Sequence, residues 1–402
     1  MLIFFNLWTG FSLLLFYAGP IPWEGARHPQ VAILVVACLA GFDIAALSVR
    51  RPPVPVGFGK ELLASPGLRF AVIAGFVVLS YLHLKSLTGL SIFDPADYSF
   101  DFGDIYANYT GALEHRTRAG LAATLLMLLK AAIFPALLLI LMRDFAANRL
   151  TTALIFFPFV ASSMMRGTDK EFFDIGIFIL LLGFYHGMLR RRFLVLVSVV
   201  PVILLFFLER KVGRFGGFMP PCLPGSVVCF DFSSSLAAVS PALEVLYVML
   251  SNYLTQGYQG LHLALGQGFE ANFGLGHLPP VKRILCDSFD VACGLGDFQD
   301  KLTRAGWDAR RNWVSVYTVI ANDTHWLLLP AYFGFLGFLF RVSEIDWQRR
   351  RDPFSLGTVV TISILLIYAS ANMQVAVSVD WVFATCLFVY GQSARIVLAR
   401  GG

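Results

Sequence analysis

Charged residues are scarce in this sequence. They make up 14% of the 402 residues, which is about half the share of ordinary soluble domains. Hydrophobic residues account for 57%, and the mean hydropathy is +0.70. Because lipid offers no partners to backbone N–H and C=O groups, regular helices must dominate such a chain. The composition therefore excludes an ordinary soluble domain and predicts an all-α polytopic membrane protein.

Several other features are absent. The chain has no internal repeat, which argues against transporters built from duplicated halves. It has no low-complexity stretch and no separate soluble domain. The acids of residues 94–104 lack a usable D-x-[DN] calcium spacing, so no metal is predicted. No ATP-binding loop or nucleotide-sugar site is present either, so we expect no cofactor.

Ten apolar stretches are long enough to be membrane-spanning helices. They cover residues 2–18, 30–49, 68–84, 120–142, 152–165, 172–189, 193–208, 326–340, 354–371 and 381–398. The first lacks a basic leader and a small-residue cleavage site, so we expect a retained helix rather than a signal peptide. The fifth is short, and we expect it to be tilted or thinned at its ends. Residues 1–402 are predicted to form a single integral membrane domain.

Basic residues in the short loops predict the orientation. With the N-terminus in the cytoplasm, the inside segments contain Arg50, Arg51, Lys60, Arg69, Arg143, Arg149, Arg190, Arg191, Arg192, Arg341, Arg349, Arg350, Arg351, Arg395 and Arg400. The short outside loops contain only Arg27, Arg166 and Lys170. This bias places both termini inside and loops 85–118 and 209–325 outside. The net charge of +5 is largely this topology signal and does not indicate nucleic-acid binding.

Four of the six cysteines lie in the large outer loop. Cys222 and Cys229 are separated by six residues, and Cys286 and Cys293 repeat this spacing. Disulfides persist on the outer side of a membrane, so two local bridges are the preferred pairing. The other pairings and four free thiols remain open.

The outer loops contain polar and aromatic residues suited to sugars. Loop 85–118 interleaves four aspartates with three tyrosines, which fits a sugar-binding surface or a solvated lid. In residues 242–265 apolar residues recur at helical spacing, broken by Gly257 and Gly260. Gln256 and Tyr258 would then present polar groups at the membrane boundary and bind substrate. The alternative is an amphipathic helix that only packs.

The outer turn between the fifth and sixth stretches is unusually basic. Arg166 and Lys170 stand where the short outer loops otherwise avoid positive charge. An anionic ligand such as a lipid diphosphate would explain them, because a guanidinium binds phosphate oxygens in a bidentate fashion. Glu171 is a candidate proton acceptor. The alternative is a self-neutralising turn in which the basic residues pair with neighbouring acids.

A second polar group stands at the end of the large loop. Arg310 and Arg311 precede the eighth stretch, and Asp323 and His325 lie at its membrane boundary. Either of the latter could act as a general base toward a sugar hydroxyl. The alternative reading of His325 is a hydrogen-bonded bystander.

Three segments resemble bacterial O-antigen or oligosaccharide repeat-unit polymerases of the Wzy type. They read SSMMRGTDKEFFDIGIFI, NYLTQGYQGLHLALGQGFEANFGLGH and NDTHWLLLPAYFGFLGF. Such enzymes also use outer-loop arginines, one of them followed eleven positions later by glycine, a spacing that Arg214 and Gly225 match.

The resemblance implies a metal-independent glycosyltransferase with a GT-C-like fold in the bacterial inner membrane. It would transfer a glycan from undecaprenyl diphosphate to the non-reducing end of another lipid-linked unit at the periplasmic face. Arg166, Lys170, Arg214, Arg310 and Arg311 would neutralise phosphate, and Glu171, Asp323 or His325 would take the proton. Expected partners are these lipid-linked oligosaccharides, membrane lipid, and a chain-length regulator and flippase of the same pathway.

Three alternatives remain open. An O-antigen ligase uses the same donor but transfers the glycan to the lipid A core. A glycosyltransferase using a polyprenyl monophosphate sugar is the second. The third, a lipid-linked oligosaccharide flippase, needs charges along a path through the bilayer. Deep in the predicted spans the chain has only Lys130 and Asp43, which we expect to form a pair.

Overall fold

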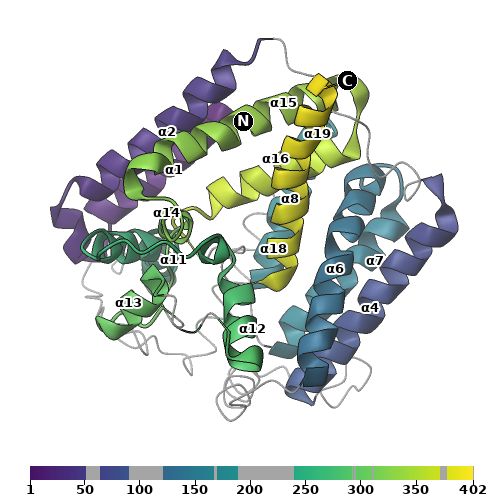
Figure 1. The fold of residues 1–402 in the computed structure, drawn as a ribbon, viewed down its shortest axis with the longest axis horizontal. Helices are drawn as coiled ribbons and strands as arrows, with labels where there is room; N and C mark the ends of the chain where they lie inside the picture. Colours follow the sequence, from purple (N-terminus) through teal and green to yellow (C-terminus); the bar gives the residue numbers. More distant parts are fainter. Residues whose placement is uncertain are drawn as a thin grey trace. The chain divides into compact units, whose positions relative to one another are not determined.

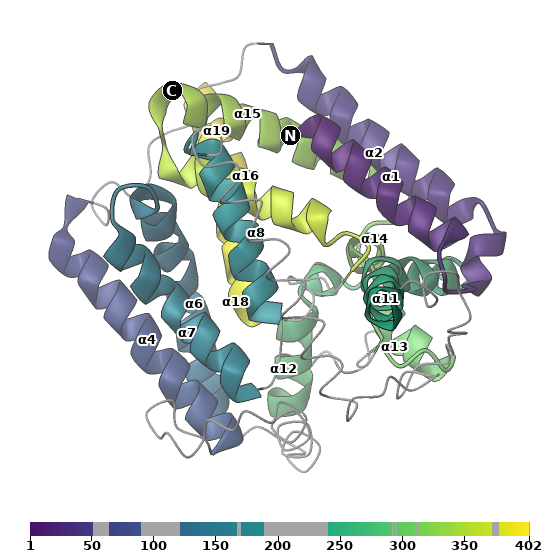
Figure 2. The same ribbon diagram turned by 180° about the vertical axis from the view of Figure 1, so that it is seen from behind.

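The computed structural model describes residues 1–50, 64–89, 121–166, 170–188, 240–291, 293, 296–309, 312–371 and 378–401. All regular secondary structure in these ranges is helical, as the composition predicted (Figures 1 and 2). The chain divides into two compact units.

Unit 1 contains the N-terminal helices and the described part of the large loop. Its elements are α1 (Leu2–Ala18), η1 (Glu24–Arg27), α2 (Gln30–Ser48), α11 (Pro241–Leu265), η3 (Leu275–His277), α12 (Pro279–Phe289), α13 (Phe298–Arg304), α14 (Val316–Ala321) and η4 (Trp326–Leu328). Helix α15 (Leu329–Arg350) belongs to it up to Ile345, and helix α16 (Pro353–Ile367) from Thr361 onward.

Unit 2 contains α4 (Pro66–Thr88), α6 (Leu121–Asp144), α7 (Arg149–Arg166), α8 (Lys170–Tyr185), the π-helical turn η5 (Cys386–Tyr390) and α19 (Gly391–Gly401). Helix α18 (Val379–Thr385) begins in unit 1 and ends in unit 2. Phe76 of α4 stacks on Phe134 of α6, with ring centroids 5.9 Å apart, and so holds two neighbouring helices together. Arg69 and Asp144 form an ion pair at 2.9 Å between the same helices.

Five helical segments are long and apolar enough to cross a membrane. They are Gln30–Ser48, Pro66–Ser86, Ala122–Asp144, Trp326–Arg350 and Val379–Ala399. Leu2–Ala18 and Pro353–Ile367 are shorter apolar helices. These spans indicate a multi-pass membrane protein. Nine of the ten predicted stretches overlap described helices, and the tenth, residues 193–208, lies outside the described residues.

The helical spacing of residues 242–265 is confirmed as helix α11, which runs without interruption through Gly257 and Gly260. A Cβ atom added at Gly257 would lie 2.4 Å from the carbonyl oxygen of Ser370, and one at Gly260 would lie 3.0 Å from that of Trp313. These glycines therefore allow close backbone packing rather than a bend. The amide of Gly257 also donates a hydrogen bond to Ser370 at 3.1 Å.

The segment that links α1 to α2, which includes η1, packs against polar side chains of α11. Trp23 Nε1 donates a hydrogen bond to Thr255 Oγ1 at 2.7 Å, and the amide of Gly25 donates to Gln259 Oε1 at 2.8 Å. Figures 1 and 2 show α11 lying against the end of the α1–α2 pair. Asp43 of α2 accepts a hydrogen bond from Asn6 at 2.7 Å. Lys130 belongs to unit 2, and its expected pairing with Asp43 stays a prediction.

Candidate functional site

Asn322 joins three segments of unit 1 at the end of the large loop. Its side chain is buried, its Oδ1 accepts a hydrogen bond from the amide of Phe298 (2.8 Å), and its Nδ2 donates to the carbonyl of Gly276 (3.2 Å). Nδ2 also donates to Gln299 Oε1 at 2.8 Å. The carbonyl of Asn322 accepts a hydrogen bond from the amide of Asn272 at 3.3 Å. The loop before α12, the start of α13 and the end of α14 are thereby held together.

Asp323, which follows this anchor, holds His277 in place. Asp323 Oδ1 accepts a hydrogen bond from the amide of Gly274 at 2.9 Å. Its Oδ2 accepts one from the amide of His277 at 2.8 Å and lies 2.6 Å from His277 Nδ1. The two side chains are 9% and 17% exposed, respectively, so this carboxylate–imidazole pair is largely shielded from water.

The hydrogen bonds determine which nitrogen of His277 carries the proton. A carboxylate only accepts hydrogen bonds, so Nδ1 must be the donor to Asp323. In a neutral ring Nε2 then carries a free lone pair. Nε2 is buried and has no hydrogen-bond partner among the residues that the structure describes, and the ring of Tyr332 lies 5.5 Å away, centroid to centroid. An oriented imidazole with a free nitrogen is the arrangement that a general base needs.

His325, predicted as an alternative base, has a different environment. It is exposed, and its Nδ1 accepts a hydrogen bond from the amide of Leu327 at 3.3 Å, which caps η4. Its ring packs edge to face against Phe269 at 5.3 Å. This geometry matches the alternative interpretation of His325 in the sequence analysis, a hydrogen-bonded residue without a catalytic role. Asp323 and His325 are thus close in sequence but make separate contacts.

Gln256 and Tyr258, predicted to bind substrate, are buried in α11. Gln256 Nε2 donates a hydrogen bond to Asn312 Oδ1 at 2.9 Å, and its Oε1 accepts one from the amide of Trp313 at 3.3 Å. The hydroxyl of Tyr258 lies 2.9 Å from Ser12 Oγ. Both side chains therefore make polar contacts within unit 1.

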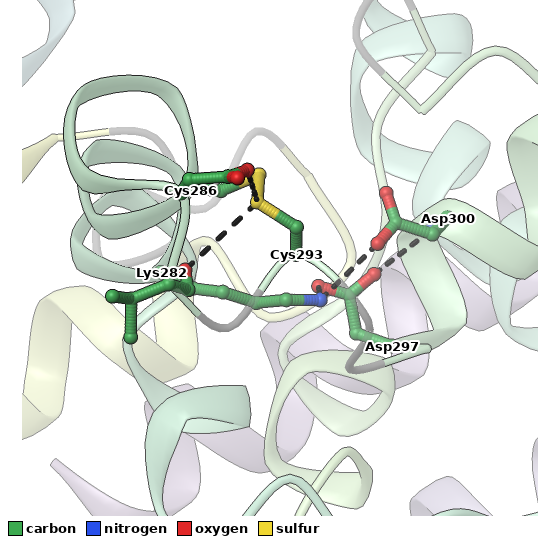
Figure 3. Close-up of a disulfide and its surroundings, with 7 residues drawn as sticks. Lys282, Cys286, Cys293, Asp297 and Asp300 are labelled. Atoms are coloured by element: carbon green, nitrogen blue, oxygen red, sulfur yellow. Dashed lines mark hydrogen bonds and ion pairs between the residues drawn. A yellow bond between two sulfur atoms is a disulfide. The ribbon is translucent and has the colours of Figure 1, made fainter.

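The predicted Cys286–Cys293 disulfide is confirmed. Figure 3 shows Lys282, one turn before Cys286 on α12, reaching two aspartates of the α13 start. Its Nζ lies 2.9 Å from Asp297 Oδ2 and 3.1 Å from Asp300 Oδ2. Burial raises the pKa of Asp297 above its ordinary value, while the hydrogen bonds from Asp300 and Lys282 act in the opposite direction. The disulfide ties α12 to the segment that follows it, and the ion pairs of Lys282 tie α12 to the start of α13.

An open hollow of about 460 Å³ in unit 1 is lined by Gln267, Gly268, Glu270, Lys301, Arg304 and Ala305. Lys301 Nζ donates a hydrogen bond to the carbonyl of Gly268 at 2.7 Å and pairs with Glu270 at 3.0 Å. Arg304 is exposed. Within the described ranges, no group of three or more His, Cys, Asp and Glu side chains could hold a metal ion.

Two histidines stack where η1 meets α11. The rings of His28 and His262 are nearly parallel, at 7°, with centroids 5.0 Å apart. Burial lowers the pKa of His262 below its ordinary value; His28 lowers it further, and Glu24 acts in the opposite direction. Folding therefore disfavours protonation of His262.

The basic outer turn belongs to unit 2. Arg166, the last residue of α7, forms an ion pair with Glu171, and its Nε donates a hydrogen bond to the carbonyl of Ser162 at 3.3 Å. This pairing is the one expected of a self-neutralising turn, so Glu171 already has a cationic partner. Lys170 begins α8. Anion binding at this turn stays a prediction.

Other predicted residues lie outside the described ranges. These are Arg214, Gly225, Arg310, Arg311, the Cys222–Cys229 pair and most of loop 85–118. His277 was not identified from the sequence, although it ends the GLGH of a segment that carries the resemblance. Comparisons with family models, curated proteins and solved structures give no match to this chain.

Proposed function

We propose that this protein polymerises lipid-linked oligosaccharide repeat units in the bacterial inner membrane. The observation that carries the proposal is the pair of Asp323 and His277, in which no group of the described ranges hydrogen-bonds to His277 Nε2. The five candidate spans supply the membrane context that a lipid-linked substrate requires. Both termini are cytoplasmic in this proposal, and the site faces the periplasm. The Cys286–Cys293 bridge favours that placement, because disulfides persist in oxidising compartments.

The proposed reaction is transfer of a glycan between two lipid carriers. The non-reducing-end hydroxyl of one lipid-linked unit attacks the anomeric carbon of a glycan on undecaprenyl diphosphate. The hydroxyl proton passes to His277 Nε2 as the new carbon–oxygen bond forms. The bond from the anomeric carbon to the diphosphate breaks, and undecaprenyl diphosphate leaves with the electron pair. The proton on His277 is then released to water or to the departing diphosphate.

Asp323 orients His277 in this scheme rather than taking the proton itself. Both of its oxygens already accept hydrogen bonds, two from backbone amides and one from His277 Nδ1. A carboxylate at Nδ1 fixes the tautomer with a free Nε2 and stabilises the positive charge that the ring gains. Because Nε2 is shielded from solvent, substrate binding must move neighbouring groups, and Tyr332 is one of them.

The leaving diphosphate needs positive charge, for which the sequence offers Arg166, Lys170, Arg214, Arg310 and Arg311. Cationic groups placed where charge develops stabilise such a departure. Arg166 is paired with Glu171, so a diphosphate would compete with Glu171 for the guanidinium. The enzyme needs no metal or cofactor, since its donor is already activated.

The test is a matched pair of histidine variants. His277→Gln and His325→Gln change the same residue type, 48 positions apart, within one segment of unit 1. Loss of a general base lowers rates by about 10²–10⁴-fold, so His277→Gln should abolish long glycans. His325→Gln removes only an exposed cap and should leave the glycan ladder intact. The readout is that ladder in a deletion strain complemented with each variant, after confirming equal expression.

The ladder also separates the alternatives. A deletion strain that adds a single repeat to its acceptor supports a polymerase, whereas a core without any glycan supports an O-antigen ligase. A flippase would be indicated if transfer continued on units already at the outer face. Long glycans in the His277→Gln strain would refute the catalytic assignment made here.

A further inference from the structure

Phe273 is both highly exposed and held in a left-handed backbone conformation. Its side chain is 87% exposed, the largest exposed fraction among the large hydrophobic residues that the structure describes. Its backbone φ is +50°, a left-handed conformation that bulky side chains adopt only at a cost in free energy. No packing within the described part of the chain compensates for that cost. Strained residues of this kind persist where the surrounding structure holds them for a function.

The backbone on both sides of Phe273 is held firmly. Asn272 is 1% exposed, and both its amide and its Nδ2 donate hydrogen bonds to the carbonyl of Asn322. The amide of Gly274 donates to Asp323 Oδ1 at 2.9 Å. The tip of this loop is therefore rigid, and it presents the phenyl ring outward without freedom to fold back.

This loop is attached to the start of a membrane span. Asp323, which binds the Gly274 amide, lies three residues before Trp326, where the candidate span Trp326–Arg350 begins. The first turn of that span presents Leu327 and Leu328, which are 82% and 58% exposed. A tryptophan followed by exposed leucines at the end of a span is typical of the lipid–water boundary.

We propose that Phe273 inserts into the outer face of the lipid bilayer and anchors the loop of residues 269–277 to it. The occupant of this exposed apolar surface is lipid, because the loop is hydrogen-bonded to Asp323, three residues before a span whose exposed leucines lipid must cover. A ring on a rigid tip inserts without losing conformational freedom, and its burial removes apolar area from water. The anchor would also hold His277, four residues further on, at the depth of lipid headgroups.

This inference does not depend on the proposed reaction. Exposed aromatic rings also stack on sugars, and they also bind other protein chains, so both occupants must be distinguished from lipid by experiment. The exposed Phe289, at the end of α12 and 58% exposed, offers a residue of the same type. Phe298, which is 2% exposed, offers a buried one.

The experiment places the photoreactive amino acid p-benzoylphenylalanine at position 273, 289 or 298 of the full chain in lipid nanodiscs. After irradiation, mass spectrometry identifies what each site has captured. We expect phospholipid adducts at 273 in several-fold greater yield than at 289 or 298. Equal yields at 273 and 289, or capture of glycan or of another copy of the chain at 273, would overturn the proposal.

A second measurement needs no variant. The wild-type protein is reconstituted with a phospholipid that carries a diazirine near its headgroup, irradiated and digested. Label on the peptide that contains Phe273, at a level similar to the peptide that contains Leu327, supports insertion. Label on the Leu327 peptide alone refutes it, even if the substituted proteins fold poorly. Retention of glycan polymerisation has no bearing on either outcome.

Discussion

Substitution of Gly257 by alanine separates two readings of α11. If this glycine only weakened a helix, alanine would stabilise the protein by about 1 kcal/mol through helix propensity. The structure predicts the opposite sign. The new Cβ would lie 2.4 Å from the carbonyl oxygen of Ser370 and 3.2 Å from the amide nitrogen of Ser315. Both obstacles are backbone atoms, which cannot rotate away as a side chain could.

The magnitude follows from two costs and one gain. Overpacking of a well-packed interior costs about 1–3 kcal/mol and occasionally more. Moving α11 away to relieve the clash also stretches the hydrogen bond from the Gly257 amide to Ser370, which is worth about 1 kcal/mol. The gain in helix propensity offsets about 1 kcal/mol of this sum. We therefore expect a net destabilisation of about 1–3 kcal/mol.

Gly10→Ala provides the control, since nothing lies within 4 Å of a Cβ atom added there, in the middle of α1. We expect this variant to be as stable as the wild type or more stable by up to about 1 kcal/mol. Thermal unfolding of the purified proteins in one detergent, followed by intrinsic fluorescence, measures both. A Gly257→Ala protein that unfolds at or above the wild-type temperature, with Gly10→Ala behaving as stated, would refute the close packing of α11.

Two further predictions concern the charged groups of unit 1. Lys282→Met leaves the buried Asp297 without its cation and should lower the free energy of unfolding by about 3–5 kcal/mol. Asp300→Asn changes a carboxylate that is 55% exposed and should lower it by under about 1 kcal/mol. Equal losses for the two variants in chemical denaturation would contradict this prediction. Because the pKa of His262 is lowered in the folded state, the unfolded chain binds a proton at this residue first as the pH falls. The contribution of neutral His262 to the free energy of unfolding is therefore full above about pH 6.5 and is lost as the pH falls below it. His262→Gln should flatten the fall of the unfolding temperature between pH 7.5 and 5, and an unchanged slope would exclude His262 as its source.

The helices of the spans were predictable because their cause is local. A run of apolar residues must form a helix in lipid whatever surrounds it, and the stretch predicted at residues 30–49 is observed as Gln30–Ser48. The structure of the large loop was harder to predict. Its helices α11 to α14 are short or interrupted by glycine in sequence, and they form because other segments pack against them. At Gly257 a residue that weakens isolated helices is required by a neighbouring backbone.

The candidate site was predictable in part. Asp323 was predicted from its position at the start of a span, where a charged side chain is costly unless it has a partner or a function. Its partner His277 is 46 residues earlier in the chain. A contact across that separation depends on how the loop folds, and a single sequence does not contain this information. His325, two residues from Asp323, was the natural partner by proximity, but its ring is used to cap η4.

The adjacent residues Asn322 and Asp323 link stability and chemistry in this protein. Asn322 holds the loop that carries His277, while Asp323 orients the imidazole on that loop. A change at either residue would loosen the loop as well as alter the ring, so loss of activity there could not be assigned to chemistry alone. His277 Nε2 bonds to no other described residue, so replacing the ring removes the proposed base at the cost of only the Nδ1 contact with Asp323 among its side-chain hydrogen bonds. Comparison of His277 with His325 is therefore a more direct test of the mechanism than any variant of the acid that orients the ring.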